Sequence, residues 1–293
     1  MELINVLATS LEMAAQSCHD SFKWQRWNCP STDFFRRRSS QKDDNVQLDR
    51  EDVYVTAINT AAILYTVTKN CSSGTVAGCG CDCRSSENCA ATVHCSDNPS
   101  ESEELYNQQH ENKIQDLEFS QSFIDSIKRH NYKVITNLMR NSLVDQCSSF
   151  IVAENRTNCW RVLRPFNEIA EDIRDMYDKS LQLSNEGSNS QVIWKNIPLD
   201  AFVYVTDSPN FCEPEALPGW SGMRGRRCMR NSSAGAASTE ERQSCLHLCR
   251  TCGYRVQTQN VLSQKVCNCR YMWGGFQVQC DMCVVVEKQH TCY

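Results

Sequence analysis

The sequence contains no long hydrophobic run. Among its 293 residues, no apolar stretch approaches the roughly 18 residues that a membrane span requires, so we expect a soluble product. An excess of charge of one sign is also missing. The 30 Lys and Arg residues against 35 Asp and Glu residues give a net charge of −5, and so mild a charge argues against general affinity for nucleic acid.

The residue patterns of enzymes are missing as well. The six histidines are scattered, and neither a nucleophile elbow nor a phosphate-binding loop is present. A catalytic site needs a nucleophile, acid or base in a defined local context, and none is visible. We therefore expect a protein that is not an enzyme and that binds no cofactor.

Cysteine, in contrast, is abundant. The chain has 20 cysteines, and ten of them lie between Cys212 and Cys292. An even and dense set of thiols indicates disulfide bonds, which persist outside the reducing compartments of the cell. We expect a secreted, extracellular protein whose C-terminal lobe is held together by disulfides.

Zinc binding is the chemical alternative for these cysteines. Cys249 with Cys252 and Cys280 with Cys283 form two CxxC pairs, a known spacing for zinc ligands. A single zinc site would leave the neighbouring cysteines unused, so we expect no metal. An intracellular zinc protein stays a remote alternative, because Met1 to Ala15 lacks the basic start of a signal peptide and fits an amphipathic helix better.

The pattern along the chain predicts an α+β protein of two domains. We expect a helical N-terminal domain over residues 1–190, which ends in the flexible composition SNEGSNS, and a linker with a cysteine-rich domain over 191–293. Apolar periodicity predicts helices, and β-type runs predict short strands. The helices are expected at 1–17, 49–70, 103–144 and 169–183, a polar connection at 30–45, and strands at 202–205, 254–257 and 280–286.

Two arginine clusters and three sequons indicate surface positions. Arg36 to Arg38 and the cluster of Arg224, Arg226 and Arg227 are typical of solvated loops; glycosaminoglycan contact and protease cleavage are the alternatives. Asn155 and Asn231 are the better glycosylation candidates. Asn70 is a weaker one, since its sequon contains Cys71.

Several segments resemble the Wnt family of signalling ligands. Residues 18–30 (CHDSFKWQRWNCP) are similar to the opening signature of that family, and 48–82 are similar to its second helix and CxCD segment. Residues 94–98 (HCSDN), the His130-Asn131 pair and the C-terminal cysteine spacing continue the match. The resemblance covers nearly the whole chain.

This resemblance implies a Wnt-like fold in which two hairpins grip a receptor. The thumb loop, residues 145–160, belongs to the helical domain, and the finger belongs to a C-terminal, cysteine-knot-like hairpin domain. The implied partners are the cysteine-rich domain of a Frizzled-type receptor and an LRP-type co-receptor, met by a monomer. The implied disulfides are Cys18–Cys29, Cys71–Cys79, Cys81–Cys95, Cys212–Cys252, Cys228–Cys245, Cys249–Cys292, Cys267–Cys283 and Cys269–Cys280; the remaining cysteines suggest Cys83–Cys89 and Cys147–Cys159.

The thumb departs from the family pattern. Counted from Cys159-Trp160, Cys147 occupies the second motif cysteine, while Asp145 and Glu154 replace two others. The same count puts Ile151 where the family has the serine that accepts an unsaturated fatty acyl group, which implies a ligand without that lipid. Ser148 and Ser149 are alternative acceptors if the alignment slips. Phe150, Ile151 and Val152 form an apolar tip that contacts a receptor or packs under the loop.

The finger departs from the pattern too. Where the family has two adjacent cysteines, this chain has glycines, which permit a tight turn. Its expected contact residues are Met272, Trp273, Gly274, Gly275 and Phe276. The resemblance is to the lipid-free kind of family member, which implies restraint of Toll/Dorsal signalling instead of β-catenin activation. An extracellular antagonist or decoy of Wnt co-receptors is the alternative.

Overall fold

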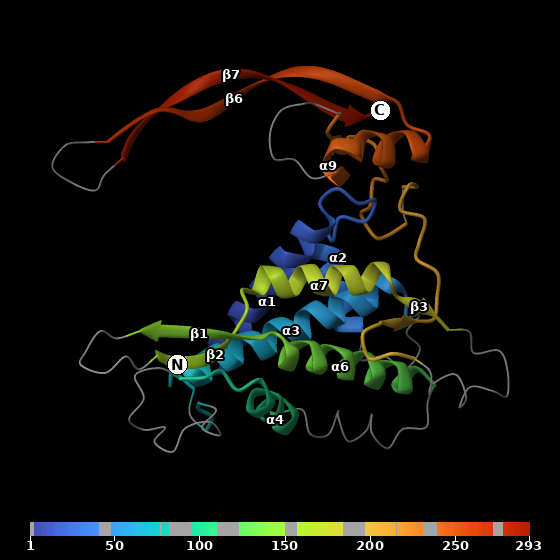
Figure 1. The fold of residues 1–293 in the computed structure, drawn as a ribbon. Coiled ribbons are helices and arrows are strands. Elements are labelled where there is room, and N and C mark those ends of the chain that lie inside the picture. Colours follow the sequence, from blue (N-terminus) through green and yellow to red (C-terminus); the bar gives the residue numbers. More distant parts are fainter. Residues whose placement is uncertain are drawn as a thin grey trace. The chain divides into compact units, whose positions relative to one another are not determined.

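The fold is α+β and divides into two compact units (Figure 1). Unit 1 comprises Met1–Ser21 and Cys29–Ser208, and unit 2 comprises Phe22–Asn28 and Pro209–Tyr293. The computed structural model describes residues 3–40, 48–76, 78–81, 95–109, 123–149, 157–183, 197–214, 216–230, 239–271 and 278–293. No helix in these ranges is long and apolar enough to cross a membrane.

The division differs from the boundary expected at residue 190. Val203 is buried in unit 1, where its backbone N–H donates to Asn131 Oδ1 at 2.9 Å and its carbonyl accepts from Asn131 Nδ2 at 2.8 Å. The short segment 22–28 joins unit 2 because buried Trp27 packs against Phe211, with 6.4 Å between the ring centroids. Long-range contacts of this kind are not visible in local composition.

Helix α3 (Arg50–Ser72) is the centre of unit 1. It begins with a capping box, in which Asp52 N donates to Asp49 Oδ1 at 2.7 Å and Asp49 N to Asp52 Oδ2 at 3.3 Å. Apolar side chains cover most of its circumference, so it is buried on nearly all sides and other helices pack around it. These are α1 (Leu3–Phe22), α2 (Ser31–Ser40), α4 (Pro99–Gln109), α6 (Phe123–Asn141) and α7 (Phe166–Asp178).

The helices at 1–17 and 49–70 were predicted well, but three other predictions were wrong in part. Helix α2 lies inside the expected polar connection at 30–45. The helix expected over 103–144 stops before Leu143, which begins β1, and its residues 110–122 lie outside the described ranges. Helix α7 ends at Asp178, before the expected 183, because β3 (Leu181–Gln182) pairs in parallel with β4 (Val203–Tyr204).

A buried arginine joins α2 to the start of α3. Arg37 is 1% exposed, and its guanidinium donates to Asp33 at 2.8 Å, Asp49 at 2.6 Å and Asp52 at 2.7 Å. Our prediction of a solvated arginine cluster was therefore wrong for this residue, which cannot reach a glycosaminoglycan. Arg36, in contrast, is 44% exposed and pairs with Asp33 from the surface.

This cluster should make stability depend on pH. Burial raises the pKa of Asp52 to about 7, helped by the charge of Asp49 and opposed by Arg37. Between pH 4 and 7, roughly, the folded chain then holds a proton that the unfolded chain has lost, so stability should fall as pH rises through this window. At about 1.4 kcal/mol per pKa unit, the change over this window of about three units should reach about 4 kcal/mol, of which about 2 kcal/mol falls between pH 5.5 and 7.

Thermal unfolding of the wild type and of Asp52→Asn between pH 5.5 and 8 tests this expectation. The difference between the two proteins isolates Asp52, because His130, whose pKa burial lowers, contributes an opposite slope to both. We expect the wild type to lose melting temperature relative to the variant as pH rises. Parallel curves would contradict the role of Asp52, and the exposed change Asp200→Asn serves as the control.

Unit 2 is a hairpin on a small cross-linked base. Strands β6 (Val256–Tyr271) and β7 (Val278–Cys292) pair along their length, and β5 (Arg227–Cys228) pairs with the end of β7. The strands expected at 254–257 and 280–286 are parts of this longer hairpin. The base contains α9 (Thr239–Ser244), a π-helical turn (Cys245–Cys249) and a 3₁₀ turn (Arg250–Cys252). Its buried cluster consists of Met223, Cys228, Cys245, Leu248, Cys249 and Cys292.

Nine disulfides link eighteen described cysteines, and no described cysteine is free. Eight of the bonds are the pairs that the resemblance implies. The ninth is Cys147–Cys159, while Cys83 and Cys89 lie outside the described residues. Each cysteine of the two CxxC pairs is bonded to a partner outside its own pair, so these sulfur atoms are not thiolates available to zinc.

Candidate functional site

The thumb hairpin is a two-stranded antiparallel ribbon. Strands β1 (Leu143–Ser149) and β2 (Thr157–Leu163) pair from Leu143 opposite Leu163 to Ser149 opposite Thr157. Cys147 lies directly opposite Cys159, with 4.1 Å between their Cα atoms, and the two are bonded. This cross-strand bond fixes the register close to the loop that joins the strands.

A buried carboxylate anchors the base of the thumb hairpin. Asp97 is 3% exposed and accepts hydrogen bonds from Lys69 Nζ and Ser72 Oγ, both at 2.6 Å, and from the backbone N–H of Leu163 at 2.7 Å. Its own N–H donates to the carbonyl of Arg161 at 2.8 Å. Asp97 therefore fastens β2 to the end of α3, a role that we did not expect from the HCSDN segment.

The expected contact residues of the thumb hairpin lie in the segment between its strands. Phe150, Ile151 and Val152 are outside the described residues, and the side chains of Ser148 and Ser149 are not described either. What the structure gives is the frame of this segment, a paired ribbon closed by Cys147–Cys159. The role of Phe150, Ile151 and Val152 as a receptor contact stays a prediction.

The finger hairpin, residues 256–292, is also a pair of antiparallel strands with disulfides between them, like the thumb hairpin. Its strands pair from Val256 opposite Cys292 to Tyr271 opposite Val278, with a bulge between Cys267 and Arg270. At the bulge Asn268 has a φ of +48°, a left-handed conformation that asparagine tolerates better than most residues. The bonds Cys267–Cys283 and Cys269–Cys280 flank this irregularity. The expected contact residues Met272, Trp273, Gly274, Gly275 and Phe276 lie outside the described residues.

In the second arginine cluster, Arg226 contacts the chain beside the base of the finger hairpin. The guanidinium of Arg226 donates to the backbone carbonyls of Arg26 at 3.1 Å and Gln25 at 3.0 Å, and lies 5.9 Å from the ring centroid of Trp220. It thereby holds segment 22–28 inside unit 2. The prediction of a solvated loop was wrong for Arg226, whereas Arg224 and Arg227 are exposed.

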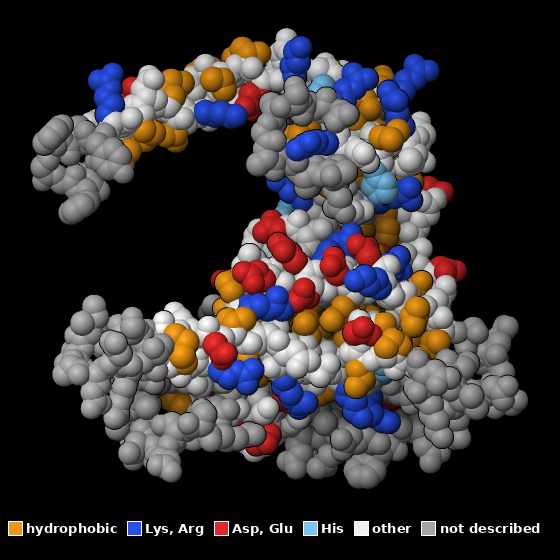
Figure 2. All heavy atoms as spheres, viewed as in Figure 1, with side chains coloured by type: hydrophobic (Ala, Val, Ile, Leu, Met, Phe, Trp, Pro, Cys, Tyr) orange, Lys and Arg blue, Asp and Glu red, His pale blue; other side chains and the backbone are white. Residues whose placement is uncertain are grey.

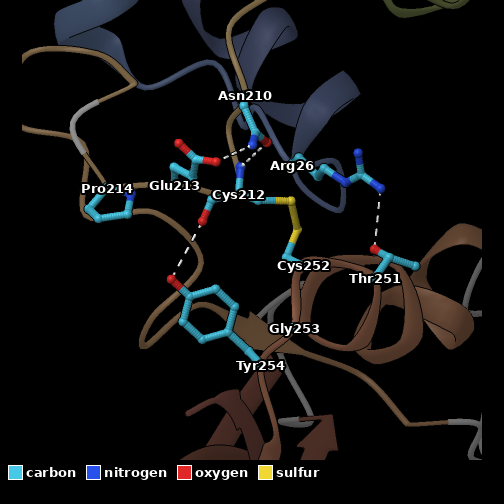
Figure 3. A pocket seen from close by; sticks show the side chains of 9 residues that line it. All are labelled: Arg26, Asn210, Cys212, Glu213, Pro214, Thr251, Cys252, Gly253 and Tyr254. Carbon is cyan, nitrogen blue, oxygen red and sulfur yellow. Dashed lines mark hydrogen bonds between the residues drawn. A yellow bond between two sulfur atoms is a disulfide. The ribbon is translucent and has the colours of Figure 1, made fainter.

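A polar pocket of about 470 Å³ lies beside this base (Figure 3). The Cys212–Cys252 disulfide forms part of its wall, and Arg26 Nη2 donates to Thr251 Oγ1 at 3.2 Å. Glu213 accepts a hydrogen bond from Asn210 Nδ2 at 2.7 Å. Among the nine lining residues, no hydrogen bond pairs a nucleophile with a base.

One sequon lies in a helix. Asn70 is near the end of α3, its Nδ2 donates to the carbonyl of Thr66 at 2.8 Å, and the hydroxyl of Ser72 donates to Asp97. A glycan on Asn70 Nδ2 would replace one of the two hydrogens of this nitrogen, next to the hydrogen bond to Thr66. Asn155 and Asn231 lie outside the described residues, so all three glycosylation sites stay predictions.

Comparison with known proteins places these hairpins in a family context. The model of the Wnt family matches residues 1–293. The Wnt inhibitor of Dorsal protein of Drosophila melanogaster is 42% identical, over 99% of this chain and 88% of that protein.

Two solved structures show the same architecture. The crystal structure of the Drosophila WntD N-terminal domain and linker is 36% identical, with a TM-score of 0.55 over 72% of this chain and all of that chain. A chain in the structure of human WLS in complex with WNT8A aligns with a TM-score of 0.71 over 99% of this chain and 93% of that chain. At 24% identity, the second match supports the fold alone. The Wnt-like fold predicted from the sequence is confirmed.

Proposed function

Because the chain belongs to the Wnt family, we propose that it is a secreted ligand that carries no fatty acyl group and binds a Frizzled-type receptor. Members of the family are signalling ligands and not enzymes. By its similarity to the Wnt inhibitor of Dorsal protein, its output is restraint of Toll/Dorsal signalling in development or immunity. At low concentration the ligand acts as a monomer. An LRP-type co-receptor is a further candidate partner.

The observation that carries the lipid-free proposal is the register of the thumb hairpin. Cys147 and Cys159 face each other and are bonded, and the count from this pair assigns Ile151 to the family's acceptor position. An isoleucine has no hydroxyl and cannot form an ester. The neighbouring Phe150 and Val152 leave an apolar loop tip without an acceptor at that position.

The loss of the lipid has a large energetic consequence. Burial contributes about 0.8 kcal/mol per CH₂ group, so a long acyl chain in a receptor groove supplies on the order of 10 kcal/mol before costs. A ligand without it binds through protein contacts alone, for which we propose Phe150, Ile151 and Val152 of the thumb hairpin and residues 272–276 of the finger hairpin. It also needs no lipid carrier for export.

Intact-mass measurement of the secreted protein tests the absence of the lipid. After removal of N-glycans, we expect the mass of the chain with its cysteines in disulfides and no fatty acyl increment. Blocking the acyltransferase of the secretory pathway should leave the secreted amount unchanged, while an acylated family member expressed in parallel should be retained in the cell. An acyl increment on Ser148 or Ser149 would overturn the proposal.

Receptor binding separates the ligand from the decoy alternative. We expect direct binding to an isolated Frizzled cysteine-rich domain, weaker than that of an acylated family member, and repression of a Toll/Dorsal reporter. A decoy would instead bind the co-receptor ectodomain and leave the Frizzled domain unoccupied.

A further inference from the structure

The finger hairpin carries an exposed apolar stripe on one face. Residues that pair directly across two strands place their side chains on the same side of the ribbon, and alternate residues share a face. Leu262 pairs with Val286, and Val266 pairs with Met282. Val284 lies between them on β7, opposite Gln264.

These side chains are open to solvent to an unusual degree. The five apolar members are between 62% and 71% exposed, and Val278 extends the stripe toward the tip at 51%. Hydrophobic side chains recur along the hairpin in Figure 2. A contiguous apolar surface of this kind, on the order of 500 Å², is at the upper end of what monomeric proteins expose and marks an interaction surface.

The two faces of the ribbon differ in charge. Between residues 262 and 266 and between 282 and 286, the stripe face carries no charged side chain. The opposite face carries the ion pair of Lys265 with Glu287, as well as Asp281 and the Cys267–Cys283 bond. An uncharged apolar face offers nothing to a charged partner, but it can pack against an identical face without repulsion.

We propose that the stripe face is a docking surface for a second copy of this chain, with two finger hairpins packed face to face. A two-fold axis near Val284, the middle of the stripe, makes the contact self-complementary and closed. Two such faces bury on the order of 1,000 Å² together, which is the lower limit for a specific interface and typical of weak, reversible association. The dimer therefore forms at high concentration, and the monomer that we expect at the receptor is its dilute form.

Sedimentation of the full secreted chain over concentrations of about 1 to 100 µM tests this proposal, because a weak interface of this size dissociates in that range. We expect the wild type to move from monomer to dimer. The double change Val284→Thr with Val286→Thr keeps the β-branched shape and should weaken dimerisation at least tenfold. The matched control, Val261→Thr with Val285→Thr, alters the opposite face of the same strands and should change it less than twofold.

Charge complementation at Val284 provides a test that does not depend on loss of association. Val284→Lys and Val284→Glu should each remain monomeric, because like charges meet near the axis, and their mixture should form a mixed dimer that salt weakens. The proposal would be overturned by a wild type that stays monomeric at 100 µM or that aggregates without limit. It would also be overturned if both pairs of Thr substitutions weakened dimerisation equally, or if the mixture of the Lys and Glu variants formed no mixed dimer. None of these outcomes bears on whether the monomer binds Frizzled.

Discussion

Replacing Arg37 with alanine should destabilise the folded protein by about 3–5 kcal/mol, the usual cost of removing one partner from a buried ion pair. The guanidinium is the shared partner of Asp33, Asp49 and Asp52, which lie within 2.8 Å of it. Without it, these carboxylates would be left buried around an empty centre. The helix that carries Arg37 would also lose its link to the capped start of α3.

Arg36 provides the matched control for this experiment. It lies on the same helix and contacts the same Asp33, but it is 44% exposed. Exposed ion pairs contribute at most about 1 kcal/mol, because solvent screens them. Arg36→Ala should therefore cost less than about 1 kcal/mol, and Arg37→Lys should fall between the two alanine variants, because an ammonium lacks the planar fork that reaches several carboxylates.

Chemical denaturation followed by circular dichroism, with disulfides intact, measures these differences. The cost of Arg37→Ala should shrink toward pH 5.5, since the raised pKa of Asp52 allows this carboxyl to take up a proton. Equal losses for the Arg36 and Arg37 variants would show that the cluster does not contribute as its geometry indicates. If Arg37→Ala is not secreted, the secreted yields of the three variants rank them instead.

The cluster around Arg37 combines a helix that local sequence predicts with one that it does not predict. Helix α3 was predictable because its apolar residues recur with helical spacing, and local periodicity determines such an element. Helix α2 was missed because its sequence STDFFRRRSS has the composition of a solvated segment. The burial of Arg37 depends on carboxylates that follow it by twelve and fifteen residues, and no local pattern indicates that pairing.

Some features of the two hairpins were likewise predictable from the sequence, and others were not. The resemblance implied the disulfide pairs, because the spacing of the cysteines can be compared directly with the family pattern. The anchoring role of Asp97 was not predicted, because its partners Lys69 and Leu163 are 28 and 66 residues away. The apolar stripe of the finger hairpin was missed for a related reason, because only the strand register places Leu262 beside Val286.

Removing the Cys249–Cys292 bond should have an effect as large as the loss of Arg37. The bond closes a loop with a sequence separation of 43 residues, and both sulfur atoms belong to residues in the buried cluster of unit 2. By the chain-entropy model its removal costs about 4 kcal/mol. Four of the six buried residues in that cluster are cysteines, so little apolar packing remains to compensate.

The Cys147–Cys159 bond gives the matched comparison. It closes a shorter loop, with a separation of 12 residues, and both of its cysteines are exposed. Unit 1 has a core of packed helices that does not include this bond. Cys147→Ala with Cys159→Ala should therefore loosen the thumb hairpin alone, whereas Cys249→Ala with Cys292→Ala should unfold unit 2.

Hydrogen exchange read by mass spectrometry can separate these two outcomes, because it maps opening along the chain. In the Cys249/Cys292 variant, we expect lost protection over β5, β6 and β7 with protection of α3 retained. In the Cys147/Cys159 variant, the loss should be confined to β1 and β2. Lost protection in both units of either variant would mean that the units unfold as one, and retained protection in unit 2 would mean that its remaining disulfides suffice. The expected pattern requires that unit 2 is stabilised mainly by its disulfides and unit 1 mainly by its buried side chains.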